Sequence, residues 1–444
     1  MKGSREKVAV TRGGSARADP IRFERLDLPG CIRLHVNSTP KLKTVLVQAV
    51  FTGNLDGSVT RKSLLPMVLR RGTMRRPDMQ AIARHLEDLY GAALASDVAK
   101  VGEWHQVKFT LEVVNDRFLP ACGGLLRQGL SFLREMLFDP RFVDGCFDRG
   151  YLDEEKNNLR RSIDALIDDK GHYAVERCVR EMCAGEEYRR YELGDTADLD
   201  GIDERGLTAV YEDWATRYPL DIHLSGDIEV ASARDLCAEI FSAIAPREAQ
   251  SGSLILAPPP SRLRVKETRT VEERLDVSQG KLILGYRHGT GFKEGDLPAM
   301  VMLNGVLGAF PHSKLFQNVR EKASLAYDIH SSFEKSKRLF FVAAGIAVEN
   351  FGRALEIIQA QLGDVAAGRI SADEILATRR SLTGHLTLME DSPGDLMEAD
   401  RAWRLHGVEF DLPAYRSRIE EVTPERIAAA AGDLELDTVY FLRS

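Results

Sequence analysis

A run of three prolines at residues 258–260, preceded by small and polar residues at 250–253, interrupts every periodic pattern in this chain of 444 residues. Such a run is typical of an exposed connection, so we predict a linker at residues 246–262. A single hydrophobic core rarely fills so long a chain. We therefore expect a first lobe at residues 21–245 and a second lobe at residues 263–444.

The order of the expected elements is the same on both sides of this linker. Each part has a strand, a helix, a pair of strands and a second helix, followed by mostly helical sequence and a short closing strand. The recurrence indicates an internal duplication, although common α and β elements could also recur by chance. The predicted fold class is α+β, with two homologous lobes that each consist of an antiparallel sheet packed with helices. The matching elements are the strands 46–51 and 282–286, the helices 78–90 and 298–307, the strand pairs 95–114 and 326–348, the helices 116–133 and 351–362, and the closing strands 221–225 and 438–442.

Composition and charge exclude two classes of partner. The formal net charge is -7, so the chain lacks the basic excess of a nucleic-acid-binding protein. The longest apolar run, residues 339–348, is about half of the roughly 20 residues that a membrane-spanning helix needs. Residues 1–20 contain several basic side chains but no apolar stretch typical of a signal peptide, and we predict a mobile N-terminal tail. We expect a cytoplasmic protein that binds neither nucleic acid nor a membrane.

The most specific motif lies at residues 315–332, which read LFQNVREKASLAYDIHSS. This stretch resembles the R-E-K-x-x-L-A-Y motif of the pitrilysin or insulinase family of zinc peptidases, also called inverzincins. In that family the motif places an arginine at a helix end and a tyrosine at the start of the next strand, and the matching residues here are Arg320 and Tyr327. The two side chains could be no more than a surface charge and a half-buried aromatic. However, guanidinium and phenol donors also suit the binding of a peptide carbonyl.

The zinc-binding motif of that family is missing from this sequence. Residues 71–73 resemble the end of the family's metal helix. The third ligand would lie seven residues after Glu155, where Ser162 stands instead. Pro66 replaces the glutamate that would act as general base, and neither histidine ligand is present. The resemblance therefore implies no catalytic residue, no metal and no other cofactor in this chain. The five positions of the H-x-x-E-H motif hold Ser63, Leu64, Leu65, Pro66 and Met67.

Other catalytic motifs are also missing from the sequence. The chain has ten histidines, and no two of them lie at the spacing by which one helix presents both to a metal. The six cysteines form no C-x-x-C pair. The sequence contains neither the G-x-S-x-G elbow of serine hydrolases nor the G-x-x-x-x-G-K-[ST] phosphate loop. Hydrolases of other classes and nucleotide-binding enzymes therefore have no support.

The resemblance implies a function without catalysis. Some bacterial members of the family divide the metal site and the arginine–tyrosine pair between two chains. We expect this chain to be a non-catalytic bacterial subunit that pairs with a homologous H-x-x-E-H chain and supplies Arg320 and Tyr327 to a peptide substrate at the partner's zinc. The alternative is a structural or scaffold protein of the same fold, which would not need these two side chains. In isolation, a homodimer could form through the surface that would otherwise meet the partner.

Overall fold

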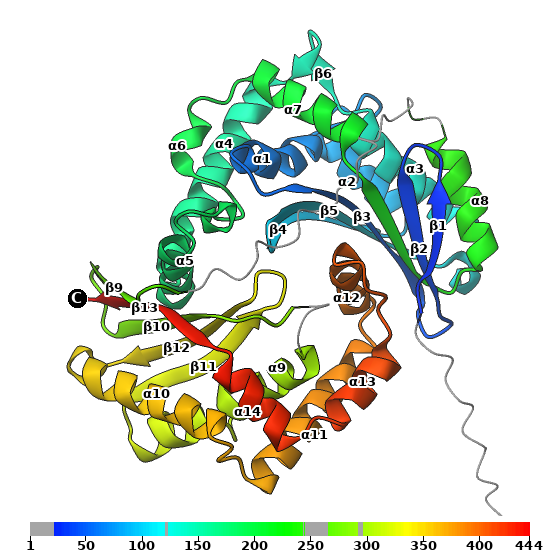
Figure 1. Ribbon diagram of the computed structural model, residues 1–444. Coiled ribbons are helices and arrows are strands. Elements are labelled where there is room, and N and C mark those ends of the chain that lie inside the picture. Colours follow the sequence, from blue (N-terminus) through cyan, green and yellow to red (C-terminus); the bar gives the residue numbers. More distant parts are fainter. Residues whose placement is uncertain (1–21, 120–122, 243, 245–264, 292–295) are drawn as a thin grey trace, which may run out of the picture.

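The described residues form two large sheets with helices packed on them (Figure 1). A third, two-stranded sheet pairs β6 Phe142–Val143 with β7 Cys146–Phe147. We call residues 22–242 the first half and residues 265–444 the second half. The predicted tail at residues 1–20 and the predicted linker at residues 246–262 lie outside the residues that the structure describes. This computed structural model describes residues 22–119, 123–242, 244, 265–291 and 296–444.

The first sheet is formed by strands of the first half, in the order β1-β2-β8-β3-β5-β4. All residues of β8 are buried, which requires cover on both faces of the sheet. The central strands are rich in valine, leucine and isoleucine, residue types that fit a pleated, buried surface. The strands are β1 Glu24–Leu28, β2 Ile32–Ser38, β3 Thr44–Asn54, β4 Ala93–Val101, β5 Trp104–Val114 and β8 Leu220–Gly226.

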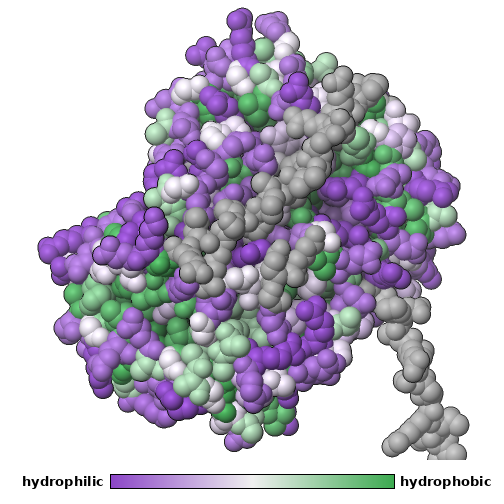
Figure 2. Space-filling model, viewed as in Figure 1, coloured by the Kyte–Doolittle hydropathy of each residue, from purple (hydrophilic) through white to green (hydrophobic). Residues whose placement is uncertain are grey.

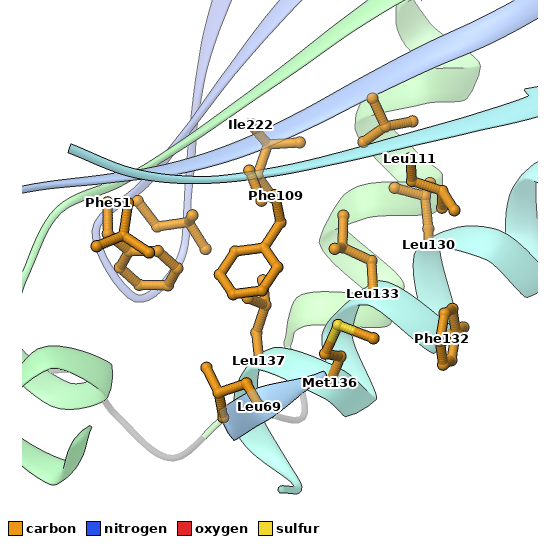
Figure 3. Packing of buried hydrophobic residues seen from close by; sticks show 14 of the residues in the cluster. Phe51, Leu69, Phe109, Leu111, Leu130, Phe132, Leu133, Met136, Leu137 and Ile222 are labelled. Atoms are coloured by element: carbon orange, nitrogen blue, oxygen red, sulfur yellow. The ribbon is translucent and has the colours of Figure 1, made fainter. Parts of the chain in front are cut away.

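Helices of the first half cover one face of this sheet and enclose the first hydrophobic core. Figure 3 shows Phe109 of β5 projecting toward Leu133 and Leu137 of α3, and all three side chains are fully buried. Each large side chain buried in this way stabilises the fold by roughly 1.5–3 kcal/mol. The helices are α1 Val59–Leu69, α2 Met79–Asp88, α3 Leu125–Phe138, α4 Arg149–Asp164, α5 Lys170–Met182, α6 Thr196–Leu199, α7 Glu204–Arg217 and α8 Val230–Phe241.

The second sheet repeats the strand order of the first. Its order, β9-β13-β10-β12-β11, matches β2-β8-β3-β5-β4 strand for strand along the chain. Each sheet is antiparallel apart from one parallel pair, β2 with β8 and β9 with β13, a detail that the prediction did not include. The shared topology is what an internal duplication produces. The strands are β9 Arg269–Arg274, β10 Gly280–Arg287, β11 Ala326–Glu334, β12 Leu339–Ile346 and β13 Glu435–Arg443.

One helix of each half packs against the sheet of the other half. Helix α5 belongs to the first half, yet its buried residues Cys178 and Met182 pack in one cluster with Phe341 and Tyr440 of the second sheet. Helix α12 belongs to the second half, yet its residue Arg401 donates hydrogen bonds to side chains of β3 and β5. Figure 1 shows both helices beside the sheet of the other half. The helices of the second half are α9 Leu297–Asn304, α10 Phe351–Ala366, α11 Ala372–Met389, α12 Pro393–Leu405, α13 Leu412–Glu420 and α14 Pro424–Gly432.

Two predicted helices differ from the observed ones. The helix predicted at residues 116–133 begins only at Leu125, because Gly124 has φ +79°, a left-handed conformation that glycine adopts without strain. The helix predicted at residues 298–307 is α9, followed by the π-helical segment η4, Gly305–Ala309. The element boundaries therefore follow backbone features that apolar periodicity does not reveal.

The surface is mainly hydrophilic on the face that Figure 2 draws, with hydrophobic residues gathered in places over the second half. Large hydrophobic side chains that are exposed include Tyr327 and Leu388 of the second half and Met74 of the first. In the part of the chain that the structure describes, the helices are too short or too polar to cross a membrane.

Candidate functional site

Helix α1 holds the five positions at which the zinc peptidases have H-x-x-E-H. Most of α1 is buried, since Leu64 and Leu65 pack into the first core. Pro66 lies inside the helix and has no N–H group, so the carbonyl of Lys62 loses its usual helical donor. Such a proline offers neither a carboxylate for proton transfer nor a ligand atom for a metal.

The side chains at the two former histidine positions cannot replace imidazole. Ser63 is buried, and its hydroxyl donates a hydrogen bond to the backbone carbonyl of Glu192 at 2.9 Å. Met67 is partly buried and packs against the first core with its thioether side chain. A serine hydroxyl and a thioether are poor ligands for Zn²⁺ compared with imidazole.

Helix α4 holds the position of the third zinc ligand. Ser162 is exposed there, and its hydroxyl donates to the backbone carbonyl of Asn158 at 3.1 Å, one turn earlier. Glu155 is buried and carries the remaining carboxylate, which accepts hydrogen bonds from Arg71 Nε and Asn158 Nδ2. Arg71 also lies 2.9 Å from Glu154. A guanidinium therefore neutralises the carboxylates that could have faced a metal.

One cavity of about 420 Å³ brings these positions together. The predicted degenerate positions thus lie side by side, although they come from helices far apart in the sequence. Their donor atoms do not fit a zinc ion, since zinc needs imidazole, thiolate or carboxylate ligands and the carboxylate of Glu155 is held by Arg71. The lining includes Ser63, Pro66, Met67, Arg71, Glu155 and Ser162.

Arg320 lies in the π-helical segment η5, Phe316–Lys322. Its side chain is exposed, and the guanidinium carbon lies 4.6 Å from the centre of the Phe316 ring. A stacked ring of this kind orients a guanidinium without using up its N–H donors. The only ion-pair contact that the described residues offer Arg320 is Glu321, at 3.7 Å. Most donors of Arg320 therefore face outward.

Tyr327 stands at the beginning of β11, the edge strand of the second sheet. The register between β11 and β12 shifts between Ala326 and Asp328, so Tyr327 sits in a bulge. Bulges redirect a side chain away from the regular pleat, and Tyr327 is 62% exposed. Ser324 has φ +53° in the short connection from η5 to β11, which turns the chain sharply between Arg320 and Tyr327.

The structure does not bring Arg320 and Tyr327 into the cavity of the degenerate metal positions, because neither residue lines it. By chain order within the duplicated topology, η5 and the start of β11 correspond to α2 and the start of β4. In the first half, Met79 of α2 and Ser96 of β4 line the degenerate cavity. Arg320 and Tyr327 therefore belong to the corresponding elements of the other half.

A second group of polar side chains, missed by the sequence analysis, is buried between the first sheet and α12. His35 of β2 and His223 of β8 are direct register partners, and their rings stack at 4.3 Å. His35 Nε2 lies 2.8 Å from Asp221 Oδ1, and His223 Nε2 lies 3.4 Å from Asp400 Oδ2. A matching apolar–histidine–apolar pattern in the two strands was the available sequence signal.

The electrostatics of this buried group follow from its pairing. Burial, together with the neighbouring His35, lowers the pKa of His223 from 6.5 to about 4. Burial alone would raise the pKa of Asp221, but His35 and Arg33 hold it below its ordinary value. At neutral pH, His223 is therefore neutral and Asp221 is ionised.

Comparisons with known proteins agree on the fold, and the matching family model and one relative are described as inactive. A family model described as the peptidase M16 inactive domain matches residues 207–382. The probable inactive metalloprotease YmfF of Bacillus subtilis (strain 168) is 34% identical over 415 residues, which are 93% of this chain and 96% of that protein. The uncharacterized zinc protease YmxG of the same bacterium is 24% identical over 315 residues, 70% of this chain and 74% of that protein.

Solved structures match over nearly the whole chain. A conserved protein from Enterococcus faecalis V583 has a TM-score of 0.87 at 27% identity, covering 95% of this chain and 99% of that one. A peptidase M16 inactive domain from Pseudomonas fluorescens has a TM-score of 0.79 at 18% identity, covering 95% of this chain and 98% of that one. The second likeness supports the fold alone.

Proposed function

We propose that this chain, which belongs to the M16 (pitrilysin or insulinase) family of peptidases, is a non-catalytic, peptide-binding subunit of a zinc peptidase. In this proposal it supplies Arg320 and Tyr327 to a peptide held at the zinc site of a homologous partner chain. The observation that carries the proposal is the exposure of both side chains, Arg320 on η5 and Tyr327 on the edge strand β11. The chain's own metal positions, by contrast, are filled by groups that do not bind zinc.

Arg320 and Tyr327 are suited to binding rather than to bond cleavage. A guanidinium offers several N–H donors, and a phenol offers one O–H donor on an apolar ring. Both can donate to a peptide carbonyl and to the oxyanion that develops from it, which is the interaction that stabilises the transition state of hydrolysis. The partner would provide the zinc-bound water and the general base.

The relatives support the existence of such a partner. One bacterium, Bacillus subtilis, has both a probable inactive metalloprotease and an uncharacterized zinc protease that are similar to this chain. A genome that encodes both types could combine them in one enzyme. The bulge at Tyr327 and the ring of Phe316 beneath Arg320 support the proposal, since both leave the side chain beside them exposed.

The test is co-expression of this chain with the H-x-x-E-H homologue from the same genome. We expect a complex that hydrolyses peptides, whereas this chain alone does not. Removing one hydrogen-bond donor to an oxyanion typically lowers kcat about 100- to 1000-fold. Arg320→Ala and Tyr327→Phe should each lower kcat/KM of the complex by at least about tenfold.

Two control variants make the result specific. Arg353→Ala removes an exposed arginine of α10, and Tyr90→Phe alters an exposed tyrosine of the first half. Neither should change the activity of the complex. If the complex forms but Arg320→Ala and Tyr327→Phe leave its activity unchanged, the chain is a scaffold. If no complex forms, the subunit proposal is wrong.

A further inference from the structure

Arg401 of α12 is a buried cation without its own carboxylate. It is 5% exposed, and its Nε and one terminal nitrogen donate to the side-chain oxygens of Gln106 and Gln48, each at 3.1 Å. No carboxylate among the described residues lies within ion-pair distance of it. Burial lowers the pKa of Arg401 despite more distant acids such as Glu398 and Asp221. Burying an unpaired charge is costly, so a protein that keeps one usually provides an anion for it.

The surroundings of Arg401 form a cavity of about 520 Å³ between the first sheet and α12. Four arginines line this cavity, and three of them have their own carboxylate. Arg401 is the fourth and has no carboxylate partner among the described residues. The cavity therefore has one positive charge that these carboxylates do not balance. The pairs are Arg25 with Asp27 at 3.3 Å, Arg33 with Asp221 at 2.5 Å, and Arg404 with Asp400 at 2.8 Å.

The two stacked histidines line the same cavity. His35 and His223 are 2% and 1% exposed. The Nδ1 atom of each is buried without a hydrogen-bond partner among the described residues, although Asp400 Oδ2 lies 3.7 Å from His35 Nδ1. Buried polar atoms in native proteins are nearly always hydrogen-bonded, and each exception suggests a missing group. Since each Nε2 faces a carboxylate oxygen, a neutral ring donates from Nε2 and accepts at Nδ1, where a hydroxyl of a bound molecule would supply the missing donor.

We propose that this cavity binds a small organic anion through a carboxylate or phosphate group held by Arg401, next to the histidine pair. Arginine binds both groups through paired N–H donors. Leu28, Ile32 and Leu405 also line the cavity and offer an apolar surface to the hydrocarbon part of such a molecule. The site lies on the first sheet and is separate from the degenerate metal cavity.

A metal ion fits the same residues less well. His35, His223 and Asp400 have ligand atoms within 4.8 Å of one another, but the imidazole planes are only 9° from parallel. A metal must lie near the plane of each ligating ring, and two stacked rings cannot both point at one ion. Arg404 already binds both oxygens of Asp400, at 2.8 and 2.9 Å. Excess positive charge also favours an anion over a cation.

The test is calorimetric titration of the full chain, purified without phosphate or carboxylate buffers. The probes are inorganic phosphate, malonate and zinc chloride, each compared with sodium chloride at equal ionic strength. We expect saturable binding of phosphate or malonate, weakened at least about tenfold in Arg401→Met, since one charged hydrogen-bonding group is worth about 1.5–3 kcal/mol. The control Arg353→Met removes an exposed arginine and should bind as tightly as the wild type.

Three outcomes would overturn this inference. They are the absence of saturable anion binding, equal binding by the wild type and Arg401→Met, or zinc binding lost in His223→Gln when no anion binds. If Arg401→Met does not fold, competition in the wild-type chain decides instead. Malonate must then displace phosphate while chloride does not, and failure of this competition also overturns the inference.

Discussion

The buried histidine at position 223 should make the protein less stable as the pH falls. Its pKa is 6.5 in the unfolded chain and about 4 in the folded chain, because burial disfavours the charged imidazole. Between pH 4 and pH 6.5, the imidazole of His223 is mostly protonated in the unfolded state and mostly neutral in the folded state. From about pH 8 to about pH 5, this difference lowers the free energy of unfolding by about 2 kcal/mol. His223→Gln should remove that contribution and keep a donor for Asp400.

The assay is urea unfolding of wild type and His223→Gln at both pH values, in chloride and sulfonate buffers. The wild type should lose about 2 kcal/mol more than the variant between the two pH values. Any loss of stability that the substitution causes equally at both pH values cancels when the change with pH is compared between wild type and variant. His330→Gln, at an exposed position of β11, is the matched control and should lose as much as the wild type. A difference below about 0.5 kcal/mol between wild type and His223→Gln would refute the reasoning.

Three further changes test the packing by urea unfolding. Gly194→Ala should cost roughly 2–4 kcal/mol, because Gly194 has φ +92° and a Cβ there would lie 2.1 Å from Thr60 Oγ1. Arg287→Met should cost roughly 1.5–3 kcal/mol, since it removes the guanidinium whose Nε lies 2.7 Å from Asp437 and leaves that carboxylate only Arg269 as an ion-pair partner, at 3.2 Å. Leu133→Ala should cost roughly 2–5 kcal/mol through the cavity left in the first core. A cost below about 1 kcal/mol at any of the three sites would contradict the packing described for it.

Periodicity in the sequence predicted the elements whose buried faces are apolar. The strands now seen as β3 and β10 and the helix α10 were each expected within a few residues of their observed bounds. Helix α12 was missed because its buried face carries Asp400 and Arg401, which break the apolar repeat. Strand β9 was missed because half of its residues are exposed charges. Local sequence patterns also do not predict that α5 and α12 pack against the sheet of the opposite half, because this depends on tertiary contacts.

The assignment of Ser63, Met67 and Ser162 to metal positions stays a prediction from the family motif, whose spacing lies within the single helices α1 and α4. The histidine pair was not found, since His35 and His223 are far apart in the sequence and meet only through the parallel pairing of β2 and β8. Helical spacing of histidines does not reveal a pair that forms across two strands. The unpaired charge of Arg401 likewise becomes visible only when the partners of the neighbouring arginines are known.

The absence of a catalytic zinc centre is tested most directly by measuring zinc content and peptide hydrolysis on the same purified sample of this chain. We predict no stoichiometric zinc in the degenerate cavity and no hydrolysis without the partner, because Ser63, Met67 and Ser162 stand at all three ligand positions. One zinc per chain together with peptide hydrolysis, both lost in Glu155→Gln, would contradict this account.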